Sequence, residues 1–151
     1  MAGRKPSTPR AVNRRLQATK DGDERRPEVI VDFVFDDGLF FISVENIGDK
    51  PALKVSVQFD QKIMGVEGGQ EISALPLFRS IEFLAPHKVI VTFLDTSAAY
   101  FRRGEPTRIA ATITYQDSNR ARYKTTLHHD LEIYKDIGYV RRLEDRAISG
   151  G

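Results

Sequence analysis

The sequence predicts a single all-β domain, a sandwich of seven to eight mostly antiparallel strands, preceded by a disordered basic arm. Two observations predict the sandwich: short segments alternate apolar and polar residues with a period of two, and turn residues separate them about every ten residues. In addition, no long amphipathic helix interrupts the pattern. A jelly roll or a barrel of similar strand count is the structural alternative.

The N-terminal arm, residues 1–27, differs in composition from the rest of the chain. It holds eight basic and three acidic residues, a net charge of +5, whereas the remainder of the chain totals −3. Val12 and Leu16 are its only large aliphatic residues, so it cannot bury enough apolar area to offset the entropy of ordering. We therefore expect the arm to be disordered alone and to bind a partner or phosphates through its cations. The candidate binding residues are Arg4, Lys5, Arg10, Arg14, Arg15 and Lys20.

The sandwich domain, residues 28–135, opens with two strands joined by a tight turn. Asp36-Asp37-Gly38 is the predicted hairpin turn, because glycine supplies the positive φ that such turns need. The chain returns over residues 39–46, turns again, and enters a regular strand with one apolar face and one polar face. The inward residues of these three strands are Val29, Val31, Phe33 and Phe35, then Phe40, Ile42 and Val44, then Leu53, Val55, Val57 and Phe59.

The middle of the domain is less regular. Residues 61–79 predict a long connection with one short edge strand near residues 71–74. A strand over residues 80–84 follows and ends at Ala85-Pro86. Residues 89–94 are apolar on both faces, so we expect this strand to be central in its sheet.

The last third predicts two further strands. Residues 95–106 are a loop with one helical turn, followed by a strand over residues 107–116 with Ile109, Ala111, Ile113 and Tyr115 inward. Asp117-Ser118-Asn119 forms the last turn, and the final strand covers residues 121–134. Residues 136–151 are a tail in which a short helix is an option.

One turn and one corner carry a resemblance to a known family. The segment from Val44 to Val57 contains Asn46-x-Gly48-x-x-Pro51-Ala52, which resembles the turn of prokaryotic immunoglobulin-like domains of the CARDB and fibronectin-III-like types. Residues 83–86 resemble the mid-domain corner of the same family, although His87 stands where that family usually has glycine. The resemblance implies an immunoglobulin-like sandwich. It leaves function open, because such domains serve as adhesins, spacers, chaperone-like modules and assembly subunits.

Few residues suggest chemistry. The chain has no cysteine, which excludes disulfides, thiolate metal sites and thiol nucleophiles. His128 and His129 are neighbours in a strand and point to opposite faces, so one metal ion cannot take both. We expect a packed His129, a solvated His128 and an exposed His87. Arg102-Arg103 and Arg120-x-Arg122 are expected to be solvated surface.

The function predicted from these features is a non-catalytic protein–protein interaction or assembly module, and not an enzyme. We assign no catalytic residue, no metal and no cofactor. The alternative is a nucleic-acid-associated or virion/phage structural protein whose basic arm contacts phosphates. Neither a signal peptide nor a membrane-spanning segment is recognisable, so membrane insertion is not expected and the predicted location is the cytoplasm.

Overall fold

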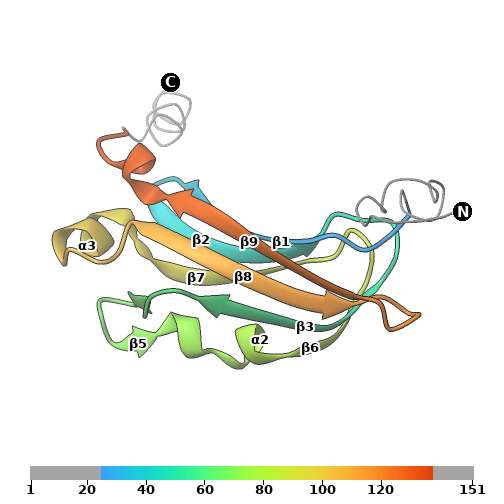
Figure 1. Ribbon diagram of the computed structural model, residues 1–151. Helices are drawn as coiled ribbons and strands as arrows, with labels where there is room; N and C mark the ends of the chain where they lie inside the picture. The colour runs from blue at the N-terminus through green and yellow to red at the C-terminus, as the bar shows by residue number, and fades with distance from the viewer. Residues whose placement is uncertain (1–24, 138–151) are drawn as a thin grey trace, which may run out of the picture.

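The computed structural model describes residues 25–137 and confirms the predicted sandwich of antiparallel strands (Figure 1). One sheet has three strands in the order β1-β2-β7, and the other has four in the order β6-β3-β8-β9. The first sheet contains β1 (Val29–Asp36), β2 (Leu39–Asn46) and β7 (Val89–Thr96). The second contains β6 (Ile81–Leu84), β3 (Ala52–Phe59), β8 (Arg108–Gln116) and β9 (Arg122–Asp130). The candidate arm residues and the tail from residue 138 lie outside the described residues.

The strand order is immunoglobulin-like, with one strand moved between sheets. In constant-type immunoglobulin domains the first, second, fifth and fourth strands form one sheet, and the third, sixth and seventh form the other. Here the fourth long strand, β6, pairs with the third, β3, where Leu53 lies opposite Phe83. As a result β7, the fifth long strand, pairs with β2 alone among the strands that the structure describes. The expectation that residues 89–94 form a central strand is therefore wrong.

The first hairpin and the core follow the sequence pattern. Asp36 pairs with Leu39, and the two loop residues Asp37 and Gly38 have φ angles of 52° and 78°, the left-handed pair of a two-residue hairpin turn. The alternating inward residues of both sheets fill the space between them. The buried core includes Val29, Val31, Phe33, Phe40, Ile42, Val44, Val55, Val57, Ile109, Ala111, Ile113 and Tyr115.

The third strand departs from its regular alternation at one residue. Lys54 has a φ of 53°, and the pairing with β8 shifts between Leu53 and Ser56. A left-handed residue inserted into a strand makes a bulge and reverses the side-chain alternation behind it. Ala52 is consequently fully buried at the start of the strand, and Leu53, predicted to point inward, is only half-buried.

Two other boundaries differ from expectation. The long connection holds a hairpin of β4 (Met64–Gly65) and β5 (Gln70–Glu71), then the 3-10 helix η4 (Ile72–Ala74) and α2 (Pro76–Arg79), where an edge strand was predicted to residue 74. The final strand ends at Asp130, because the 3-10 helix η5 (Leu131–Tyr134) follows. This helix breaks the period of two, so Leu131 is buried while Ile133 is 64% exposed. The predicted helical turn is α3 (Ser97–Arg102), with Thr96 as its N-cap.

Asn46 joins the turn and the corner that carry the family resemblance. Its side chain is fully buried, and its Oδ1 accepts hydrogen bonds from the amides of Glu28 and Gly48 at 3.1 and 3.0 Å. Its Nδ2 donates to the carbonyls of Lys50 and Leu84 at 2.8 and 3.1 Å. One side chain thus fixes the entry to β1, the turn after β2 and the end of β6.

Within residues 25–137, no helix combines the length and apolar character that crossing a bilayer requires.

Candidate interaction surface

The free edge of β7, residues 89–93, carries an exposed apolar stripe. Val89, Val91 and Phe93 point away from the core and are 45%, 53% and 39% exposed. Ile90 lies on the opposite side of the strand and packs against the core. Both faces of this strand are apolar, as the sequence indicated, but one of them is uncovered.

The stripe continues across the outer face of the three-stranded sheet. Val34, Phe41 and Phe93 form one row across β1, β2 and β7, since Val34 pairs with Phe41 and Phe41 pairs with Phe93. The rings of Phe41 and Phe93 meet edge to face with centroids 5.8 Å apart. Val34 is 36% exposed, so the apolar character extends to the far strand. Together with Val89 and Val91, this row forms a surface of the kind that marks interaction sites.

The backbone of the free edge is also available for pairing. The Asn46 amide donates to the Lys88 carbonyl at 3.1 Å. Hydrogen-bonded pairs recur at every second residue of an antiparallel ladder, so Val44–Ile90 and Ile42–Thr92 are the hydrogen-bonded pairs between β2 and β7. The amides and carbonyls of the intervening Val89, Val91 and Phe93 then point outward from the sheet. Among the described residues, no backbone hydrogen bond from outside the β2 pairing reaches residues 89–93.

Charged residues protect the other edges of the sandwich but not this one. Asp32 lies in the middle of edge strand β1, Glu82 lies in β6, and Arg122 and Lys124 lie in β9. In contrast, residues 89–94 contain no charge, no glycine and no proline. Native proteins place such residues on edge strands to prevent pairing with other chains. Among the described residues, one edge of four lacks them.

A bulge at the corner before β7 closes one end of the free edge. His87 has a φ of 65° and donates its amide to the Asn46 carbonyl at 2.7 Å, while Asn46 donates to Lys88. This is the pattern of a bulge whose first residue is left-handed. The imidazole of His87 lies on the surface, as expected, 3.3 Å from the carboxylate of Asp49.

The hairpin of β4 and β5 closes the other end. The Val66 amide donates to the Leu94 carbonyl at 2.9 Å, one residue beyond the free edge. Gly65 makes this approach possible, because a Cβ at this position would overlap the same carbonyl and lie 2.8 Å from the side chain of Ile72. The free edge is therefore five residues long, with a structured closure on each side.

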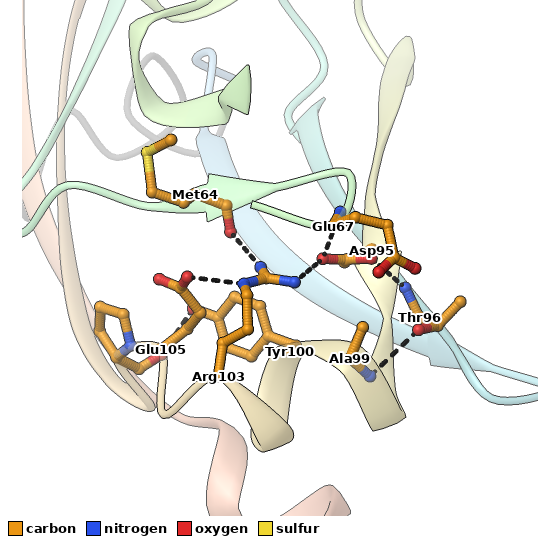
Figure 2. Close-up of polar contacts among 9 residues, drawn as sticks. Met64, Glu67, Asp95, Thr96, Ala99, Tyr100, Arg103 and Glu105 are labelled. Carbon is orange, nitrogen blue, oxygen red and sulfur yellow. Dashed lines mark hydrogen bonds and ion pairs between the residues drawn. The ribbon is translucent and has the colours of Figure 1, made fainter. Parts of the chain in front are cut away.

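An ion-pair network holds this hairpin against the end of β7 (Figure 2). The guanidinium of Arg103 lies 2.8 Å from the buried carboxylate of Asp95 and 3.0 Å from Glu105, and its Nη2 donates to the Met64 carbonyl at 3.2 Å. Asp95 also accepts hydrogen bonds from the amides of Thr96 and Glu67. The prediction that Arg103 is solvated surface is wrong, because its side chain is only 22% exposed. Arg102 is exposed as expected.

The electrostatics of the network favour the charged guanidinium. Partial burial acts to lower the pKa of Arg103, but hydrogen bonds to Glu105 and Asp95 and their negative charges outweigh it, so the pKa is raised. The neighbouring Tyr100 is buried and donates its hydroxyl to the Pro106 carbonyl at 2.6 Å. Burial, followed by the charge of Glu105, raises the pKa of this phenol. These groups therefore have a structural role: they hold the hairpin of β4 and β5 against the end of β7.

Charge is unevenly distributed along the strands. Apart from Asp32 and Arg79, which lie near the middle of the strands, the half of the sandwich that contains the start of β1 holds eight basic and five acidic residues among those described. The half that contains α3 holds five basic and ten acidic residues. The basic residues of the first half are Arg25, Arg26, Lys50, Lys54, Lys88, Arg120, Arg122 and Lys124. The acidic residues of the second half are Asp36, Asp37, Asp60, Glu67, Glu71, Asp95, Glu105, Asp130, Glu132 and Asp136.

The basic half includes a hollow lined by cationic side chains. Its volume is about 470 Å³, and Lys54, Arg122 and Lys124 line it together with Thr114 and Gln116. Arg26 lies over the ring of Tyr123 at 5.8 Å. Arg26 therefore lies at the same end of the domain as the hollow, on the opposite face of β9 from Arg122 and Lys124.

The remaining candidates from the sequence have packing roles. The ring of His129 lies 5.1 Å from that of Phe33, and its Nε2 has no hydrogen-bond partner among the described residues. His128 is exposed on the opposite face of β9. Both placements confirm the expectation. Within residues 25–137, no group of three or more histidine or carboxylate side chains is arranged to hold a metal ion.

Sequence reasoning missed the free edge, although a signal for it was present. Residues 89–94, which follow the corner at residues 85–88, form an uncharged run of six. Such a run is typical of a buried central strand or of an edge strand that pairs with another chain. The decision between them depends on where β6 pairs, which no local pattern reveals.

A family model described as Domain of unknown function (DUF8453) matches residues 7–135. Comparison with curated proteins and with solved structures gives no match.

Proposed function

The chain belongs to the DUF8453 family, and we propose that it is a non-catalytic protein-binding and assembly module that docks a protein partner on the free edge of β7. The observation that carries the proposal is the exposed stripe of Val89, Val91 and Phe93 on an edge strand without protective charge. Outward amides and carbonyls provide main-chain hydrogen bonds to an added strand, and the alternate side chains provide specificity.

The resemblance to CARDB and fibronectin-III-like modules agrees with this proposal in kind, since domains of those types act by binding and spacing other proteins. It remains a prediction at the level of the fold. The closures at Asn46 and at Arg103 support the docking role more directly, because they give the edge a defined length and a rigid frame.

Affinity purification with quantitative mass spectrometry tests the proposal. The chain, a Val91→Lys variant and a Gln58→Lys control would be used as baits in extract from the source cells. Gln58 is exposed in the centre of the other sheet, so the control adds the same charge away from the edge. We expect proteins retained by the chain and by the control to be lost with Val91→Lys. Identical sets of bound proteins for all three baits would contradict the proposal.

The basic half of the sandwich favours a second candidate function, the binding of nucleic acid. The arm, with its net charge of +5, joins the described chain at Arg25 and Arg26, at the same end of the sandwich as the hollow lined by Lys54, Arg122 and Lys124. A phosphate-binding footprint that continues from an arm onto a folded surface is typical of nucleic-acid-binding proteins. The acidic half limits such a footprint to one end of the domain.

Salt dependence tests the second candidate. Fluorescence anisotropy with a labelled DNA or RNA duplex would compare the chain with an Arg122→Ser/Lys124→Ser variant. We expect the logarithm of affinity to fall with the logarithm of salt concentration, with a slope of about −0.9 per phosphate contacted, and the double variant to lower that slope by about two contacts. An unchanged slope would show that the sandwich takes no part in binding.

A further inference from the structure

We propose that the occupant of the free edge is the free edge of a second copy, so that two β7 strands pair antiparallel about a twofold axis at Val91. This inference rests on the proposed function, because it names the partner of the same edge. Its product is a dimer in which the two three-stranded sheets become one continuous sheet of about six strands.

The register follows from the alternation of side chains and hydrogen bonds. Residues directly opposite each other in an antiparallel pair point to the same face, so Val91 must meet a residue of the outward set. A twofold axis at Val91 places Val91 opposite Val91 and Val89 opposite Phe93 of the second copy. The amides and carbonyls of these three residues are the ones that point away from β2. Each opposed pair can therefore exchange two hydrogen bonds.

The two closures of the edge suit this register. The bulge ends at Lys88, and the hairpin of β4 and β5 is hydrogen-bonded to the Leu94 carbonyl, so each of these contacts lies three residues from Val91. In the pair, Leu94 of one copy comes opposite Lys88 of the other, where the chain leaves the strand at the corner. The hairpin of one copy thus lies next to the point at which the strand of the second copy ends. The edge is symmetric about its own middle residue, as a self-pairing strand requires.

Charge complementarity favours a second copy as the occupant. Antiparallel pairing places the basic half of one sandwich beside the acidic half of the other, and the twofold axis repeats this contact. Near the axis, Lys88 of each copy faces the β4–β5 turn that carries the exposed Glu67 of the other. Parallel alignment would instead place the like-charged halves of the two sandwiches beside each other.

The size of the contact sets its strength. Five paired residues on each strand lie at the low end of specific interfaces, so we expect a weak dimer whose population rises with protein concentration. Phe93 and Phe41 beside the axis extend the apolar contact over the outer face of the joined sheets.

Disulfide trapping of the full-length chain tests the pairing, since the natural sequence has no cysteine. Opposite residues in a hydrogen-bonded antiparallel pair have Cα atoms about 5.5 Å apart, within the range that a disulfide spans. A Val91→Cys variant is therefore expected to form a cross-linked dimer under mild oxidation. The matched control is Asp32→Cys, which lies in the same row of the same sheet on its opposite edge. It is expected to stay monomeric.

The register is tested by mixing two further variants. Val89→Cys and Phe93→Cys are each expected to cross-link poorly alone and efficiently when mixed, because each residue faces the other across the axis. Sedimentation velocity of the unmodified chain and of Val91→Lys gives the equilibrium counterpart. We expect Val91→Lys to raise the dissociation constant of the dimer by roughly tenfold or more, because it opposes two like charges on the axis.

The possible results separate this inference from the proposed function. Cross-linking of Val91→Cys, with the mixed pair favoured over either variant alone, supports self-pairing. A chain that sediments as a monomer at every concentration, with no more cross-linking at Val91 than at Asp32, overturns it. If Val91→Lys nevertheless loses a bound protein in the purification experiment, the docking function stands and its partner is a different protein.

Discussion

The guanidinium of Arg103 lies 2.8 Å from the carboxylate of Asp95, which is 1% exposed and stands where β7 ends. Removing the cation leaves a buried charge without its counter-ion. We expect Arg103→Ala to lower the free energy of unfolding by about 3 kcal/mol, measured by urea denaturation. The exposed neighbour provides the control, since Arg102→Ala is expected to change it by less than about 0.5 kcal/mol. Equal losses in the two variants would contradict the structural role of the ion pair.

The Asn46 side chain makes four hydrogen bonds that no other residue type can supply together. Asn46→Ala leaves two amides and two carbonyls without partners, and we expect it to cost about 3 kcal/mol of stability in urea denaturation. Asn46→Asp keeps the acceptor for Glu28 and Gly48 but turns a carboxylate oxygen toward two carbonyls. It is expected to be destabilising as well. An unaltered midpoint for Asn46→Asp would mean that the donor bonds contribute nothing.

Gly48 lies against the backbone that enters β1. A Cβ at this position would overlap the Arg26 carbonyl and lie 2.6 Å from the Glu28 amide nitrogen, and neither backbone group can rotate away. We expect Gly48→Ala to destabilise the domain by about 1–3 kcal/mol, with thermal unfolding as the measurement. Gly69→Ala is the matched control, because its nearest neighbour, the Val66 carbonyl, would be 3.4 Å away. Comparable losses at both glycines would refute the steric explanation.

The stability of the fold should fall at high pH. Burial, followed by the hydrogen bond that its hydroxyl donates to Asp117, raises the pKa of Tyr123 to about 12. Because the folded pKa is above the ordinary value of 10.0, the contribution is complete below pH 10 and is lost as the pH rises toward about 12. Burial raises the pKa of Tyr115 and Tyr100 in the same direction.

The Tyr123→Phe variant isolates one part of this effect. It is expected to show a shallower loss of stability above pH 10, measured by urea midpoints across the pH range, and a parallel profile below it. Identical slopes for the two chains above pH 10 would show that Tyr123 ionises equally well in the folded and unfolded states.

Local sequence determined the elements whose causes are short-range. The turn at Asp37-Gly38 follows from the backbone freedom of glycine, and the buried faces of β1, β2 and β8 follow from alternation alone. The bulge at Lys54 was not predictable in this way, because nothing in the side chain of lysine favours a left-handed backbone. It is imposed by pairing with β8.

The candidate site depends on contacts between distant segments. An apolar strand such as residues 89–94 has the same appearance whether a neighbour covers it or not, and the partner that would have covered it pairs with β3 instead. Arg103 had the sequence context of a surface residue, but the hairpin at Met64 folds over it. The basic arm residues Arg4 to Lys20 lie outside the described part of the chain, so their role stays a prediction.

The described chain enters the sandwich at the start of β1 and leaves it after η5, at the opposite end of the domain (Figure 1). A pulling force applied through these two points would run along the strands. It would draw β1 lengthwise against β2, so that the eight residue pairs from Val29–Asn46 to Asp36–Leu39 bear the load together and do not open one at a time. The domain is therefore arranged to resist mechanical extension along its strands.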